Sequence, residues 1–64
     1  MDEKQFRSFV KQCIADRPDL KEEIEDLVQL AYDEIESGQS QWHEFELAYT
    51  DIKDLMADTI VNNE

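Results

Sequence analysis

The sequence predicts an all-α fold, a small up-down-up three-helix bundle, and three observations lead to this prediction. Apolar residues recur at intervals of three and four, which is the spacing of one helix face. Pro and Gly each occur once in 64 residues, too rarely for a β-rich or loop-rich chain. Pro18 and Gly38 interrupt the apolar pattern, so we expect helices at about residues 2–16, 19–36 and 41–60.

The first predicted helix carries one apolar stripe with a basic flank. The stripe follows the i, i+3, i+4, i+7, i+8 pattern and consists of Phe6, Phe9, Val10, Cys13 and Ile14. Lys4, Arg7 and Lys11 lie together along one side of it. Pro18 ends this helix, because the residue before a proline is pushed out of the α region.

The second predicted helix begins near Pro18, since proline is favoured in a first helical turn. Asp19 and Glu22 have the spacing of a capping box, so we expect the Asp19 side chain to cap this helix. Leu30 and Tyr32 widen its apolar face on opposite sides. The face itself consists of Leu20, Ile24, Leu27, Val28, Ala31 and Ile35.

Gly38 separates the second helix from the third. We expect it to adopt the left-handed conformation that ends a helix, and we expect Ser40 to cap the next one. Short links favour antiparallel neighbours, so the three apolar faces meet in a single domain spanning residues 1–64. A two-helix hairpin with a loose first segment is the alternative. The third face consists of Trp42, Phe45, Ala48, Tyr49, Ile52, Leu55, Met56, Thr59 and Ile60.

The twelve residues from Asp33 to Glu44 share three fixed points with an EF-hand calcium loop, namely Asp first, Gly sixth and Glu last. The third position is Ile35, which has no side-chain oxygen and continues the apolar stripe of the second helix. We therefore interpret Asp33–Glu36 as helix and expect no metal site here.

The residue types that catalysis needs are sparse. The only histidine, His43, has Glu46 one turn away, but a metal site needs three or four ligands. The only cysteine, Cys13, lies in the first apolar stripe, where we expect a buried thiol without a nucleophilic role. We therefore expect no enzyme, no cofactor, and no catalytic or metal-binding residues.

Charge is the main feature of the chain. Seventeen acidic residues against six basic ones give a net charge of −11. Residues 1–21 carry a net +1 and residues 22–64 a net −12. Such a surface repels nucleic acid and anionic membranes and attracts basic surfaces. We therefore expect a basic protein surface as the partner, with no direct binding to nucleic acid or membrane.

The sequence also predicts a compartment. A single cysteine allows no intrachain disulfide, the polar start MDEKQF resembles no signal peptide, and no apolar run approaches the roughly 18 residues of a membrane span. These features predict a cytoplasmic protein.

Leu47 is the anomaly of the third helix, because it points away from the apolar face and lies in a row of acids. Isolated surface leucines are ordinary, yet a leucine framed by carboxylates suits a partner that is both basic and partly apolar. Trp42, beside the turn, either caps the core or anchors a partner. The predicted partner-binding residues are Glu44, Leu47, Asp51, Asp54, Asp58, Asp26, Asp33 and Trp42.

Two functions remain open. In the first, the chain is a small acidic interaction protein, in its sharper form an inhibitor whose carboxylates, about 4.5 to 10 Å apart along the third helix, imitate the phosphates of a nucleic acid. A short acidic helical chain of this kind is typical of phage- and plasmid-type accessory proteins.

In the second, the chain is a self-associating helical structural protein whose acidic surface only keeps it soluble. A homodimer of −11 chains repels itself unless its interface lies among the basic residues of the first helix. We expect a monomer or a weak homodimer, and the candidate interface residues are Leu30, Tyr32, Trp42 and Leu55.

Overall fold

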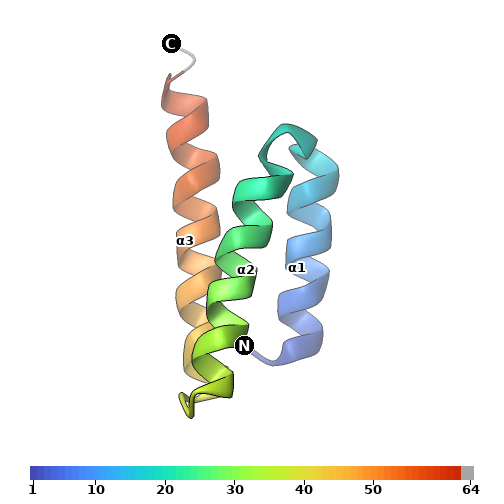
Figure 1. Ribbon diagram of the computed structural model, residues 1–64. Coiled ribbons are helices and arrows are strands. Elements are labelled where there is room, and N and C mark those ends of the chain that lie inside the picture. Colours follow the sequence, from blue (N-terminus) through green and yellow to red (C-terminus); the bar gives the residue numbers. More distant parts are fainter. Residues whose placement is uncertain (63–64) are drawn as a thin grey trace.

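Over residues 1–62, three α-helices joined by two short links make up the fold in the computed structural model (Figure 1). They are α1 (Glu3–Asp16), α2 (Lys21–Glu36) and α3 (Gln41–Asn62), and a 3₁₀ turn, η1 (Pro18–Leu20), precedes α2. The structure describes the backbone of residues 1–62 and the side chains of residues 1–57. α1 and α3 run in one direction and α2 in the other, so the predicted up-down-up three-helix bundle is confirmed.

The start of α1 is held by a capping box that the sequence analysis missed. The Asp2 carboxylate accepts a hydrogen bond from the backbone N–H of Gln5 at 2.8 Å, and the Gln5 side chain accepts one from the backbone N–H of Asp2 at 3.3 Å. Two N–H groups that have no partner inside the helix are satisfied in this way.

The predicted cap of α2 by Asp19 is wrong. The Asp19 carboxylate instead accepts two hydrogen bonds from the Arg17 guanidinium, at 3.1 and 2.8 Å. The helix N-cap is Leu20, which has no capping side chain. A bidentate pair with arginine is stronger than a hydrogen bond to a neutral N–H, and the 3₁₀ turn places Asp19 one residue before the cap position.

The turn between α2 and α3 has the predicted form. Gly38 has φ = 115°, and its N–H donates to the carbonyl of Ile35 at 3.0 Å while the N–H of Gln39 donates to that of Glu34 at 3.0 Å. This is the Schellman arrangement that ends a helix. The Ser40 hydroxyl then accepts a hydrogen bond from the N–H of His43 at 3.4 Å, as an N-cap does.

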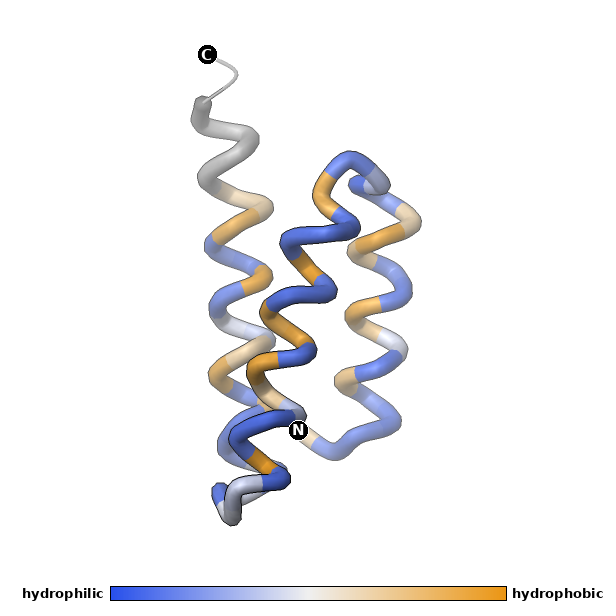
Figure 2. The backbone as a smooth tube through the Cα atoms, in the orientation of Figure 1, coloured by the Kyte–Doolittle hydropathy of each residue, from blue (hydrophilic) through white to orange (hydrophobic). Residues whose placement is uncertain are grey.

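Among the side chains of residues 1–57, the core consists of two clusters stacked along the bundle. Each helix in Figure 2 shows hydrophobic positions separated by hydrophilic ones, and the hydrophobic positions supply these clusters. The first cluster contains Phe6, Ala31, Phe45 and Ala48. The second contains Cys13, Leu20, Ile24 and Ile52. Half-buried Ile35 packs against the first cluster, which confirms Asp33–Glu36 as helix.

Candidate partner-binding groove

A groove between α2 and α3 contains Leu47, and we call it the acidic groove. Its volume is about 110 Å³. Four residues of each helix line it: Leu27, Leu30, Ala31 and Glu34 from α2, and Glu44, Leu47, Ala48 and Asp51 from α3. The structure therefore brings together three residues predicted for the site, Glu44, Leu47 and Asp51.

Two leucines from different helices give the acidic groove an exposed apolar surface. Leu30 is 58% exposed and Leu47 is 48% exposed. Between the helices lie two buried alanines, Ala31 and Ala48. Their small side chains fill little of the space between α2 and α3, so the groove stays open beside the two leucines. The apolar surface near Leu47 thus belongs to two helices.

No ion pair with a described residue neutralises the carboxylates around these leucines. Among the side chains that the structure describes, ion pairs join the N-terminus of Met1 to Glu46 at 3.0 Å and Arg17 to Asp19 at 2.8 Å, and neither pair involves a groove residue. The one lysine of α3, Lys53, lies with its ammonium 5.1 Å from the centre of the Tyr49 ring. The carboxylates of Glu34, Glu44 and Asp51 therefore leave the groove negative.

The other predicted acids lie around the groove rather than in it. Asp54 is exposed on α3, one turn beyond Asp51. Asp26 and Asp33 are exposed on α2, one turn on either side of Leu30. The side chain of Asp58 lies outside the described residues. Asp26, Asp33 and Asp54 thus extend the negative surface along both helices.

Trp42 belongs to a different surface. It is 61% exposed, so the interpretation that it caps the core is wrong. It precedes Leu47 by five residues, which places the two side chains about 140° apart around the helix. Its neighbours lie at the N-terminal end of the bundle and include Met1, Asp2 and Glu3. The structure therefore does not bring Trp42 together with the acidic groove.

Leu30 and Glu34 also line the acidic groove, although neither was predicted as a partner-binding residue. They are four residues apart and so lie on one side of α2. The sequence shows that spacing. It does not show the register of α2 against α3, which places this side of α2 beside Leu47.

The only cysteine of the sequence is buried and the only histidine is exposed. Cys13 is 5% exposed, and burial raises the pKa of its thiol, with a further contribution from the nearby charge of Asp16. His43 is exposed at the start of α3. Among the side chains of residues 1–57, no group of three or more histidine, cysteine or acidic residues is placed to hold a metal ion. Over the same part of the chain, no helix combines the length and apolar character needed to cross a bilayer.

Comparisons of the chain with protein-family models, with curated proteins and with solved structures found no match. The interpretation of the acidic groove therefore depends on its own geometry and charge.

Proposed function

We propose that the protein is a small non-enzymatic interaction protein of the cytoplasm that binds a basic, partly apolar protein surface through the acidic groove. The observation that carries this proposal is the position of Leu30 and Leu47, two exposed leucines on separate helices, among Glu34, Glu44 and Asp51. Lysine and arginine side chains match such a surface, because their methylene stems cover apolar groups while their charged ends reach carboxylates.

In the sharper form of the proposal the protein is an inhibitor that occupies the nucleic-acid site of its partner. Half-buried Glu44 and exposed Asp51 and Asp54 recur along α3, separated by about 10.5 and 4.5 Å along the helix axis. These separations are of the order of phosphate spacing along a strand, and the net charge of −11 supports the same role.

The test is affinity capture from nuclease-treated host lysate, followed by binding measurements with the purified partner. Reversing Asp51 and Asp54 to Lys should slow association and reduce its salt dependence, because exposed charges act mainly on encounter. Leu47→Ala should instead speed dissociation by about fivefold to thirtyfold, equivalent to about 1–2 kcal/mol. The matched control reverses Asp16 and Glu22, which are exposed and outside the groove, and should change affinity less.

Competition with duplex DNA separates the two forms of the proposal. If the protein imitates nucleic acid, DNA and the protein should exclude each other from the partner. A ternary complex would reject mimicry and keep the interaction role. If Leu47→Ala and the Asp51/Asp54 reversals leave affinity unchanged, the acidic groove is not the binding site, and its charge serves solubility alone.

A further inference from the structure

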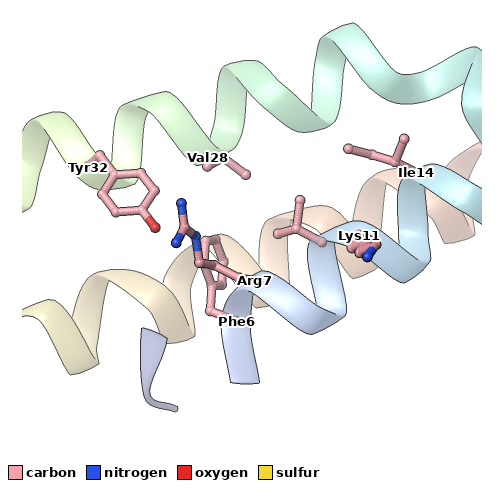
Figure 3. Close-up of a pocket in the computed structure, with 7 residues that line it drawn as sticks. Phe6, Arg7, Lys11, Ile14, Val28 and Tyr32 are labelled. Carbon is pink, nitrogen blue, oxygen red and sulfur yellow. The ribbon is translucent and has the colours of Figure 1, made fainter. Parts of the chain in front are cut away.

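A second groove lies between α1 and α2, on the opposite side of α2 from the acidic groove. Its volume is about 330 Å³, and all of its lining residues belong to α1 and α2 (Figure 3). The apolar side chains at its surface include Val10, Ile14 and Val28, each half-buried. Val28 and Leu30 are two residues apart, about 200° around the helix, so α2 presents separate faces to the two grooves.

The α1 edge of this groove is basic. Arg7 and Lys11 line it, one helical turn apart, and both are exposed. Figure 3 shows the Arg7 side chain extending toward Tyr32 on α2. Neither cation belongs to an ion pair in the part of the chain that the structure describes. We call this surface the basic groove.

The α2 edge of the basic groove is acidic. Glu25 precedes Val28 by three residues and Glu36 follows Tyr32 by four, so each lies one turn from a groove residue on the same flank of α2, and both are exposed. Tyr32 donates a hydrogen bond from its hydroxyl to Glu3 on α1, at 3.1 Å. The face thus consists of an apolar strip with cations along one edge and carboxylates along the other.

We infer that this face binds a second copy of the same chain. A two-fold axis along the strip places α1 of one copy over α2 of the other. Arg7 and Lys11 of each copy then meet the flank of its partner that carries Glu25 and Glu36. Such an isologous interface contains each contact twice. The charges of this face are also complementary to those of a second copy of the same face. No other apolar surface described above has this property.

Net charge favours this face over the others for self-association. Two chains of charge −11 repel each other, and the repulsion is smallest where the basic residues of the chain are concentrated. Residues 1–21 carry a net +1, and they include all of α1. An interface through the acidic groove would instead bring together two surfaces that are negative throughout.

The size of the face limits the area that a dimer can bury. A stable interface buries about 800 Å² on each partner, about a sixth of the 4634 Å² surface of this protein. With 14 and 16 residues, α1 and α2 are about 21 and 24 Å long, so they supply such an area only along their full length. A dimer that dissociates in the micromolar range or above is therefore expected.

The test is sedimentation equilibrium of the full chain over a concentration series, with charge-reversal variants. Reversing Arg7 and Lys11 to Glu should weaken the dimer by about tenfold or more, because both edges of the face become acidic. Reversing Glu25 and Glu36 to Lys should also weaken it, because both edges become basic. An equimolar mixture of the two variants should form a heterodimer, in which every edge again meets its opposite.

The matched control replaces Lys53, Gln39 and Gln41, all exposed and outside the basic groove, with Glu, which lowers the net charge by the same four units. It should weaken the dimer less than the Arg7/Lys11 reversal, and circular dichroism should show that every variant remains helical. Sedimentation of the natural chain as a 7.6 kDa monomer up to about 1 mM would overturn the inference. Equal effects of the control and the groove reversal, or failure of the mixed variants to associate, would also overturn it.

Discussion

The rings of Phe6 and Phe45 stack with their centroids 4.6 Å apart and 12° between their planes. Both side chains are fully buried. Tyr32 meets the Phe45 ring edge-on, at 5.6 Å and 74°. Phe45 therefore contacts an aromatic ring from each of the other two helices, and this one residue joins α1, α2 and α3.

Replacing Phe45 with Ala should destabilise the protein by about 3–5 kcal/mol, the usual cost of removing a buried aromatic side chain. So small a domain has little stability to lose, so Phe45→Ala should leave the chain largely unfolded. Phe45→Leu, which keeps most of the apolar volume, should be measurable by urea denaturation. Trp42→Ala is the control, and its exposed side chain should contribute within about 0.5 kcal/mol. Equal losses for the two Ala variants would contradict the role of Phe45.

Gly38→Ala should destabilise the protein by about 1 kcal/mol or more. A methyl group at Gly38 would meet no atom within 4 Å, so the cost comes from the backbone, whose φ of 115° disfavours L side chains. Gln39→Ala, at the next exposed position, should be nearly neutral. The two free energies of unfolding can be compared by urea denaturation. An unchanged value for Gly38→Ala would mean that the turn adopts another conformation at little cost.

Titration of Tyr32 should lower the stability of the folded protein as the pH rises above about 10. Burial raises the pKa of the Tyr32 hydroxyl, the hydrogen bond to Glu3 and the charge of Glu3 raise it further, and nearby Arg7 offsets only part of this rise. The unfolded chain loses this proton near pH 10 while the folded chain retains it. Stability is therefore complete below about pH 10 and falls as the pH rises from there through the higher folded value.

Tyr32→Phe should lose less stability over that interval than the natural chain. The measurement is the free energy of unfolding at several pH values between about 9 and 11.5. Cys13, whose pKa is also raised by burial, is present in both chains, so its contribution cancels in the difference. Parallel pH profiles for the two proteins would contradict the prediction.

Added salt should raise the melting temperature. The chain has a net charge of −11, and the ion pairs among its described side chains are Met1–Glu46 and Arg17–Asp19. Repulsion among the carboxylates therefore outweighs these pairs, and salt screens it. Calorimetry of a dilute sample at about 0.01 and 0.3 M NaCl tests this. The gain should be smaller for the Asp51/Asp54 reversal to Lys, whereas a melting temperature that falls with salt would show that the ion pairs dominate.

The fold could be predicted because the apolar periodicity and the residues that end helices act locally. The apolar spacing and the residues Pro18 and Gly38 fixed three helices whose ends differ from the expected ones by about two residues. Asp19 shows where local rules fail, because its spacing to Glu22 satisfies a capping box while Arg17, two residues earlier, binds its carboxylate more strongly.

The candidate site could be predicted only in part. Leu47, Glu44 and Asp51 share one side of a single helix, so their proximity follows from helix geometry alone. Leu30 joins them only through the register of α2 against α3, which no local pattern specifies. Trp42 lies on the wheel beside the apolar face, but at the end of the bundle no further helix covers it, and so it is exposed.

The brevity of the two links has a kinetic consequence. Residues 17–20 and 37–40 are the only chain between successive helices, so closing each hairpin costs little loop entropy and most contacts form between near neighbours. Helical proteins with such local topology fold in microseconds to milliseconds. A chain of this kind is therefore expected to fold rapidly once its synthesis is complete. Fast folding leaves little time in which its apolar faces are exposed to aggregation.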